Sequence, residues 1–279
     1  MGKVFDALEK HKQDRLIRPN RLGPQDVTHQ VPQAPRAQGF PVQNGFSPKL
    51  IAVSAPDSID AENFKVLRSQ ILYPKDGSKP RTIMITSAFP GEGKTFVAAN
   101  LAASIAMGVN EHVLLVDCDF RSPSLHDMLG YANIEGLYEY LTAKKTLSEL
   151  LVGTKMDKLS LLTAGRPGPD GPELLSSTKM KEFLEDVKGR HEEKFPENVK
   201  GRHEETYVIL DTAPSHLTAE VGVLSNHVDG IVYVVMAERA PRETIQKGIE
   251  PLGREKIRGI VFNGYAQSYK AYHKYYGEY

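Results

Sequence analysis

Apolar residues along the chain fall into short continuous runs, separated by segments with helical periodicity. Continuous runs rich in Val, Ile and Leu are typical of strands buried on both faces of a parallel sheet. They predict strands over residues 82–86, 112–116, 159–163, 207–210, 230–236 and 257–262. Helical spacing predicts helices over residues 61–72, 94–106, 180–188 and 242–252. This alternation indicates an α/β fold with a doubly wound, mostly parallel sheet covered by helices on both faces.

The N-terminal segment departs from this pattern. Val4, Phe5 and Leu8 have helical spacing, so residues 1–10 are predicted to form a short amphipathic helix. Residues 11–49 are rich in Pro, Gln, Arg, Asn and Gly and have the composition of a disordered linker. The predicted organisation is therefore a helix at 1–10, a linker at 11–49, an α/β domain at 50–264 and a tail at 265–279.

Composition and charge exclude several classes of protein. The 35 Lys and Arg residues are balanced by 35 Asp and Glu residues, whereas nucleic-acid binders usually carry a basic excess, so no nucleic-acid partner is expected. Cys118 is the single cysteine of the sequence and cannot form an intramolecular disulfide. No signal peptide is recognisable, and the longest apolar runs fall short of the roughly 20 residues of a membrane helix. These features predict a cytoplasmic protein without a membrane span of its own.

The predicted strand at 82–86 leads into the sequence SAFPGEGKT and then directly into a predicted helix. This order is that of a P-loop, in which glycines bring backbone N–H groups and a helix N-terminus to phosphates. The loop residues Gly91, Glu92, Gly93, Lys94 and Thr95 are the predicted nucleotide contacts. The lysine reaches the β- and γ-phosphates and the threonine hydroxyl ligates Mg²⁺, so ATP and Mg²⁺ are the predicted cofactors.

Three acidic residues follow predicted strands. Asp117 and Asp119 lie in VLLVDCDFR, at the end of a strand that we expect beside the P-loop strand, and Asp211 closes the strand YVILD. Ligands of open α/β sheets bind at the carboxyl edge of the strands. Asp117 and Asp119 could bind a water ligand of Mg²⁺ and accept a proton. Asp211 has the position of a Walker-B carboxylate. An isolated aspartate at a strand end is more often a helix cap, but three of them downstream of a P-loop favour a metal site.

The last fifteen residues, YAQSYKAYHKYYGEY, contain six of the twelve tyrosines of the chain. Polar and basic residues separate these tyrosines, so a packed role is not expected. They are either hydroxyl acceptors in phosphoryl transfer, an aromatic docking segment for a partner, or a disordered tail of accidental composition. The candidate acceptors are Tyr265, Tyr269, Tyr272, Tyr275, Tyr276 and Tyr279.

The string VKGRHEE occurs at residues 187–193 and again at 199–205. Two copies of a 12-residue unit are too few for a solenoid, so we expect a surface excursion between a helix and the next strand. The two His-Glu-Glu triplets are better explained as a solvated charged face than as a metal site.

The combination of SAFPGEGKT, VDCDFRSPSLH, VILDTAP and a tyrosine-rich C-terminus resembles the CpsD/CapB-like bacterial tyrosine kinases of capsule and exopolysaccharide export. The opening MGKVFDALEK is similar to that of the exosortase-associated autokinases. The resemblance implies a P-loop NTPase of the MinD/ParA-like (SIMIBI) type. It implies that Lys94 and Thr95 serve phosphate and Mg²⁺, that Asp117 and Asp211 complete the metal site, and that Asp119 is the base. Asn263 corresponds to a residue that contacts adenine in related P-loop proteins.

The family's oligomerisation motif, Glu-x-x-Arg-x-x-Arg, is altered in this chain. The matching residues are Glu62, Lys65 and Arg68, and a lysine cannot make the bidentate contact of an arginine. The resemblance implies a ring-shaped homo-oligomer. Because Lys65 replaces the family's arginine, the sequence supports ring assembly less strongly than it supports ATP binding. It also implies an activating cytoplasmic segment from a membrane-bound polysaccharide chain-length regulator, which would bring the chain to the inner face of the membrane.

The hypothesis that combines these features is trans-autophosphorylation of the tail, in which one subunit's tyrosines enter a neighbour's ATP site. One alternative is a MinD/ParA-like ATPase switch. Such proteins carry a lysine early in the loop, where this chain has Phe89. Another alternative is an ATP-gated scaffold without kinase activity.

Overall fold

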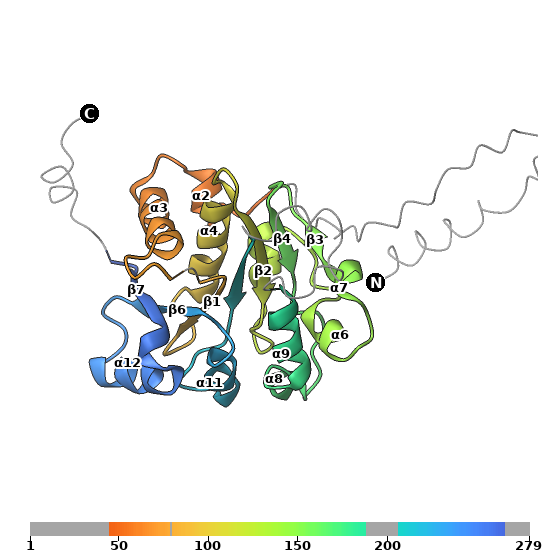
Figure 1. Cartoon of the computed structure of the whole chain (residues 1–279). Helices are drawn as coiled ribbons and strands as arrows, with labels where there is room; N and C mark the ends of the chain where they lie inside the picture. The colour runs from red at the N-terminus through yellow and green to blue at the C-terminus, as the bar shows by residue number, and fades with distance from the viewer. Residues whose placement is uncertain (1–44, 79, 188–205, 266–279) are drawn as a thin grey trace, which may run out of the picture. The chain divides into compact units, whose positions relative to one another are not determined.

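The computed structural model describes residues 45–78, 80–187 and 206–265 of the 279-residue chain. Within these ranges the strands form one seven-stranded sheet, which Figure 1 shows between two layers of helices. The strands are β1 (Thr82–Ser87), β2 (His112–Asp117), β3 (Val152–Gly153), β4 (Leu159–Leu162), β5 (Thr206–Asp211), β6 (Gly230–Met236) and β7 (Ile257–Asn263).

The strand order is β3-β4-β2-β5-β1-β6-β7, and every neighbouring pair is parallel except β3 with β4. The predicted doubly wound parallel sheet is confirmed. The expected adjacency of β1 and β2 is wrong, because β5 lies between them and pairs with both. The carboxyl end of β5 therefore lies directly beside the P-loop strand, and Asp211 is the Cα partner of both Ile85 and Asp117.

Helices cover both faces of the sheet. On one face lie α2 (Ile51–Ser54), α3 (Ile59–Leu72), α4 (Lys94–Ala106) and α5 (Leu125–Leu129), which contribute to one apolar cluster. The opposite face is covered by α6 (Leu137–Leu141), α7 (Leu147–Leu150), α8 (Gly171–Leu174), α9 (Thr178–Glu185), α11 (Ala219–Ser225) and α12 (Arg242–Ile249). The 3₁₀ turns η4 (Glu250–Leu252) and η5 (Arg254–Lys256) join α12 to β7.

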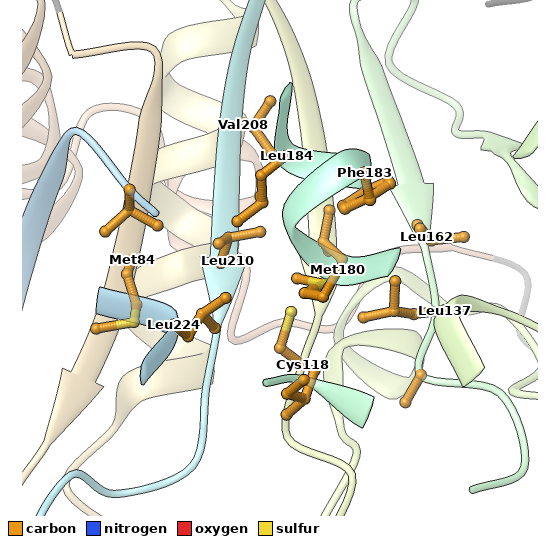
Figure 2. Packing of buried hydrophobic residues seen from close by; sticks show 14 of the residues in the cluster. Met84, Cys118, Leu137, Leu162, Met180, Phe183, Leu184, Val208, Leu210 and Leu224 are labelled. Atoms are coloured by element: carbon orange, nitrogen blue, oxygen red, sulfur yellow. The ribbon is translucent and has the colours of Figure 1, made fainter. Parts of the chain in front are cut away.

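The core consists of two apolar clusters separated by the sheet. Alternate residues of each central strand enter opposite clusters, as the pleat requires: Met84 contributes to one cluster, whereas Ile83 and Ile85 contribute to the other. Figure 2 shows the first cluster, in which Met180, Phe183 and Leu184 of α9 pack over the sheet near Leu210. Every residue of β1 is buried, and Ile83, Met84 and Ile85 at its centre form a continuous apolar run, as expected of a strand covered on both faces.

Helix ends follow local capping chemistry that the periodicity did not include. The helix predicted from residue 61 begins at Ile59, because the Ser58 hydroxyl accepts a hydrogen bond from the Ala61 N–H at 3.2 Å. α9 begins two residues before its predicted start, after Ser177 caps it in the same way. The helix predicted over 242–252 is α-helical to Ile249 and then continues as the 3₁₀ turn that contains Pro251.

Residues 45–49 were assigned to the linker, yet they pack against the domain. The Ser47 N–H donates to the Met128 carbonyl at 3.0 Å, and the Lys49 carbonyl accepts a 3.0 Å hydrogen bond from the Asn100 side chain. These residues therefore belong with the α/β domain. The helix predicted at 1–10, the rest of the linker and residues 188–205 of the duplicated segment lie outside the described residues. Among the helices that are described, none combines the length and apolar character needed to cross a membrane.

Candidate functional site

The predicted P-loop connects β1 to α4 at the carboxyl edge of the sheet. Gly91 and Gly93 have φ values of +75° and +94°, which lie in the left-handed region that side chains disfavour. A Cβ at residue 93 would overlap the side-chain nitrogen of Asn263. Lys94 opens α4 and is only 7% exposed, so its ammonium group is held at the loop rather than in solvent. The local geometry is that of a phosphate cradle at a helix N-terminus.

Three side chains hold the P-loop against the ends of β6 and β7. Glu92 is fully buried, and its carboxylate accepts hydrogen bonds from the N–H groups of Phe89 (2.7 Å) and Met236 (3.3 Å). Asn263 donates to the Glu92 carbonyl at 2.9 Å, and Arg239 donates to the Gly91 carbonyl at 2.9 Å. We refer to Glu92, Arg239 and Asn263 as the P-loop brace.

The brace refines two of the predicted nucleotide contacts. The Glu92 side chain is directed into the protein, so only its backbone can contribute to a phosphate site. The Asn263 amide nitrogen already donates to the loop, and an adenine contact by Asn263 remains a prediction. Arg239 was not identified from the sequence, because a contact from the loop after β6 leaves no local pattern.

Asp211 is the predicted site residue whose surroundings most need a cation. It is fully buried at the end of β5, and neither carboxylate oxygen has a hydrogen-bond partner among the described residues. Burial raises the pKa of Asp211 to about 7, although the nearby Thr95 hydroxyl and Lys94 ammonium lower it. An unpaired buried carboxylate is costly, so these oxygens are suited to a positive ligand.

Asp117 makes three hydrogen bonds to the backbone of its own loop, and its predicted role at the metal stays a prediction. One carboxylate oxygen accepts the N–H of Asp119, and the other accepts the N–H groups of Ser124 and Leu125, each at 3.1 Å. Asp117 therefore anchors the loop from β2 to α5. Burial and the neighbouring Asp211 charge raise its pKa, because two carboxylates on adjacent strand ends disfavour joint ionisation.

These residues fit a magnesium ion of the P-loop type. The Thr95 hydroxyl and the unpaired Asp211 carboxylate are oxygen donors, which Mg²⁺ prefers, and Mg²⁺ usually takes only one or two protein ligands together with phosphates and water. In the described part of the chain no three His, Cys, Asp or Glu side chains form a metal-binding group. Asp117 would act through water or through the loop that it anchors.

A cavity of about 320 Å³ opens beside the P-loop. Its lining includes the polar side chains of Lys94, Thr95 and Asp119 and the apolar residues Pro90, Pro214 and Leu217. Leu217 is 54% exposed although it is apolar. Asn263 is not among the residues that line this cavity. The cavity combines phosphate-binding groups, a carboxylate and an apolar surface in one space.

The predicted oligomerisation residues all lie on α3. Lys65 and Glu62 form an exposed ion pair at 2.9 Å within the helix. Arg68 donates to the Ser104 carbonyl of α4 at 2.7 Å, so this arginine serves the monomer's own helix packing. Only the first two side chains are exposed on the surface of the chain.

Of the predicted acceptors, Tyr265 lies within the described residues and is 71% exposed. Tyr269, Tyr272, Tyr275, Tyr276 and Tyr279 lie outside them. β7 ends at Asn263 and Tyr265 follows two residues later, so the tail begins beside the P-loop brace.

Comparison with known proteins decides the family. A family model described as the CobQ/CobB/MinD/ParA nucleotide binding domain matches residues 83–278 and confirms the predicted P-loop fold. Tyrosine-protein kinase YwqD of Bacillus subtilis is 32% identical over 230 residues, which cover 82% of this chain and 91% of YwqD. The chain belongs to the bacterial tyrosine kinases. The resemblance inferred from the sequence motifs is thereby confirmed.

Two further similarities support this family assignment. The solved kinase domain of the Escherichia coli tyrosine kinase ETK is 25% identical, covers 79% of this chain and 83% of that chain, and has a TM-score of 0.67. The succinoglycan biosynthesis transport protein ExoP of Rhizobium meliloti is 30% identical over 218 residues, 76% of this chain and 26% of ExoP. YwqD and ETK, which are both named as tyrosine kinases, favour a kinase over the MinD/ParA-like switch, although both types share the nucleotide-binding fold.

Proposed function

We propose that this chain is an ATP-dependent protein-tyrosine autokinase of capsule or exopolysaccharide synthesis that phosphorylates its tyrosine-rich tail in trans. The observation that carries the proposal is the cavity, whose lining includes the polar side chains of Lys94 and Asp119 together with the apolar residues Pro90, Pro214 and Leu217. A water-activating ATPase has no need of such an apolar lining, whereas a tyrosine ring has an apolar body and a polar end.

The P-loop residues supply the donor half of the site. Backbone N–H groups from Gly91 to Thr95 and the α4 N-terminus bind the triphosphate, and Lys94 neutralises charge on its terminal part. Thr95 and Asp211 would hold Mg²⁺, which would supply positive charge to offset that of the phosphates. The brace holds this loop in place before ATP arrives, which lowers the cost of organising the site.

Asp119 supplies the acceptor half. Its side chain lines the cavity and accepts a hydrogen bond from the Ser122 N–H at 3.1 Å. A tyrosine ring placed on Leu217 would direct its hydroxyl toward this carboxylate. A bond forms between the tyrosine oxygen and the γ-phosphorus, the bond from the γ-phosphorus to the bridging oxygen breaks, and ADP leaves. The hydroxyl proton passes to Asp119.

The remaining proposals concern assembly. A ring of copies would place the tail of one subunit at the cavity of the next, and Glu62 and Lys65 on α3 are exposed for such contacts. A cytoplasmic segment of a membrane-bound chain-length regulator would activate the kinase and hold it at the inner face of the membrane. Each tyrosine phosphate would add about −1.5 to −2 charge, so a heavily phosphorylated tail would be repelled from neighbouring sites.

Incubation with ATP and Mg²⁺ tests the kinase activity. The purified full chain, a variant truncated before Tyr265 and Lys94→Met are compared for ATP hydrolysis and for phosphotyrosine. The expected result is phosphotyrosine on the full chain alone. Hydrolysis without phosphotyrosine in any sample would support the ATPase switch, and nucleotide binding without turnover would support the scaffold. Phosphotyrosine on Lys94→Met would reveal a contaminating kinase.

A further inference from the structure

A second concavity, of about 640 Å³, adjoins the ATP cavity. Arg121 lines both spaces, and Thr218 of the ATP cavity is followed directly by Ala219 of the second one. The second space lies between the loop after β2, the segment around α8 and the start of α11. We refer to it as the acceptor groove and define it by Arg121, Pro169, Pro172, Glu173 and Glu220.

The lining of the groove combines two prolines with two carboxylates. Glu173 is exposed. The Glu220 side chain is only 11% exposed and forms an ion pair with Arg121 at 3.2 Å. The positive charge of Arg121 therefore offsets the negative charge of Glu220. Among the residues that define the groove, Glu173 is left as the one charge without an opposite partner. Proline rings offer flat apolar surface for an extended peptide with aromatic side chains. The groove is thus suited to a peptide that carries aromatic residues and basic residues together.

The tail of a second copy has this composition. Residues 265–279 contain six tyrosines, with Lys270 and Lys274 among them and Glu278 near the end. We propose that the acceptor groove binds the tyrosine tail of another copy while one of its tyrosines occupies the ATP cavity, and that Glu173 selects tyrosines with a lysine close by. This inference rests on the proposed kinase activity and adds the substrate class, which is a lysine-flanked tyrosine peptide.

Spacing in the tail turns this selection into a preference among acceptors. An extended chain rises about 3.3 Å per residue, so a lysine within two residues of the acceptor lies within about 7 Å of it along the peptide. Four tyrosines have such a lysine: Tyr269, Tyr272, Tyr275 and Tyr276. Tyr265 and Tyr279 have none. The groove therefore favours the four central tyrosines.

A charge-exchange experiment tests the proposal. The full chain is assayed for phosphorylation of two synthetic peptides. One has the natural sequence of residues 265–279, and the other carries Lys270→Glu and Lys274→Glu. Glu173→Lys is the enzyme variant, and Glu182→Lys, on the exposed side of α9, is the matched control. Since exposed ion pairs contribute up to about 1 kcal/mol, reversing one charge should raise KM for the natural peptide about fivefold or more. The exchanged peptide should recover a lower KM on Glu173→Lys, whereas Glu182→Lys should behave as the unmodified chain.

The outcomes separate the groove from the kinase activity. Equal KM values for both peptides on all variants would overturn the groove, as would a change confined to the KM for ATP. Phosphotyrosine on the full chain but not on the natural peptide would also contradict the groove, because the groove should bind the tail sequence as a separate peptide. If the unmodified chain formed no phosphotyrosine on itself or on the peptide, the kinase activity would fail together with the groove.

Discussion

Replacing Glu92 with glutamine tests the role of the P-loop brace. The Glu92 carboxylate accepts hydrogen bonds from the backbone N–H groups of Phe89 at 2.7 Å and Met236 at 3.3 Å. A glutamine has one acceptor oxygen, so its NH₂ group must face one of these two donors. The change is nearly isosteric, which means that the hydrogen-bond arrangement is altered with little change in packing.

The expected cost follows from the burial of the site. Leaving one buried backbone donor unsatisfied costs about 1–3 kcal/mol. With a urea m-value of about 1–3 kcal/mol/M, a loss near the middle of that range lowers the unfolding midpoint by about 1 M. Part of the same energy is lost from ATP binding, because a displaced loop must be reorganised around the phosphates, and about 1.4 kcal/mol corresponds to a tenfold weaker Kd.

The assay pairs urea unfolding with ATP titration for Glu92→Gln and for Glu182→Gln, an exposed glutamate on α9. Substitutions at such surface positions usually change stability by no more than about 0.5 kcal/mol. We expect a lower urea midpoint and weaker ATP binding for Glu92→Gln alone. If both variants matched the unmodified chain in midpoint and in Kd, the reasoning on the brace would be refuted. Lower stability with unchanged ATP affinity would leave the carboxylate a purely structural role.

Three further predictions follow from the site and its surroundings. Because burial raises the pKa of Asp211 to about 7, above the ordinary value of 3.8, its contribution favours the fold below about pH 4 and is lost as pH rises through about 7. In urea unfolding without Mg²⁺, the unmodified chain should therefore lose more stability than Asp211→Asn as pH rises from about 4 to about 7. Parallel plots of unfolding free energy against pH for the two proteins would contradict this. Arg68→Ala should lose about 1.5–3 kcal/mol by the same method, since its charged hydrogen bond to Ser104 holds α3 on α4, whereas Lys65→Ala should lose at most about 0.5 kcal/mol; equal losses would be inconsistent with that contact. Leu217→Ser should raise KM for the tail peptide without changing KM for ATP in steady-state assays, and the reverse pattern would remove Leu217 from the acceptor site.

The buried parallel strands could be predicted closely because their burial leaves a direct trace in the sequence. β6 has its predicted bounds, and α4 begins and ends where predicted. The short helices α5 to α8, of four or five residues each, were not predicted because so few residues show no periodicity. β3 has two residues and could not be recognised for the same reason.

The order of strands in the sheet could not be predicted from local patterns. β1 and β2 are consecutive in the sequence and were expected to be neighbours, but β5, about 90 residues further on, lies between them. The position of Asp211 beside the P-loop is therefore a consequence of topology.

Individual roles at the site were predicted to different extents. The P-loop and the importance of the three aspartates could be inferred because motifs and strand ends are local features. Their division of labour could not: Asp117 bonds three backbone N–H groups, whereas Asp211 bonds to none of the described residues. Glu92 was predicted as a nucleotide contact, and only the fold brings its carboxylate to the Met236 N–H.

A mixing experiment tests the central claim most directly. Lys94→Met serves as the acceptor because it keeps the tail and loses the phosphate-binding lysine, and a chain truncated before Tyr265 serves as the enzyme because it keeps the site and loses the tail. The two are incubated together with ATP and Mg²⁺, and phosphotyrosine is located by mass spectrometry. We predict phosphotyrosine on the tail of Lys94→Met in the mixture and in neither protein alone. A mixture without phosphotyrosine, under conditions in which the unmodified chain labels its own tail, would contradict phosphorylation in trans.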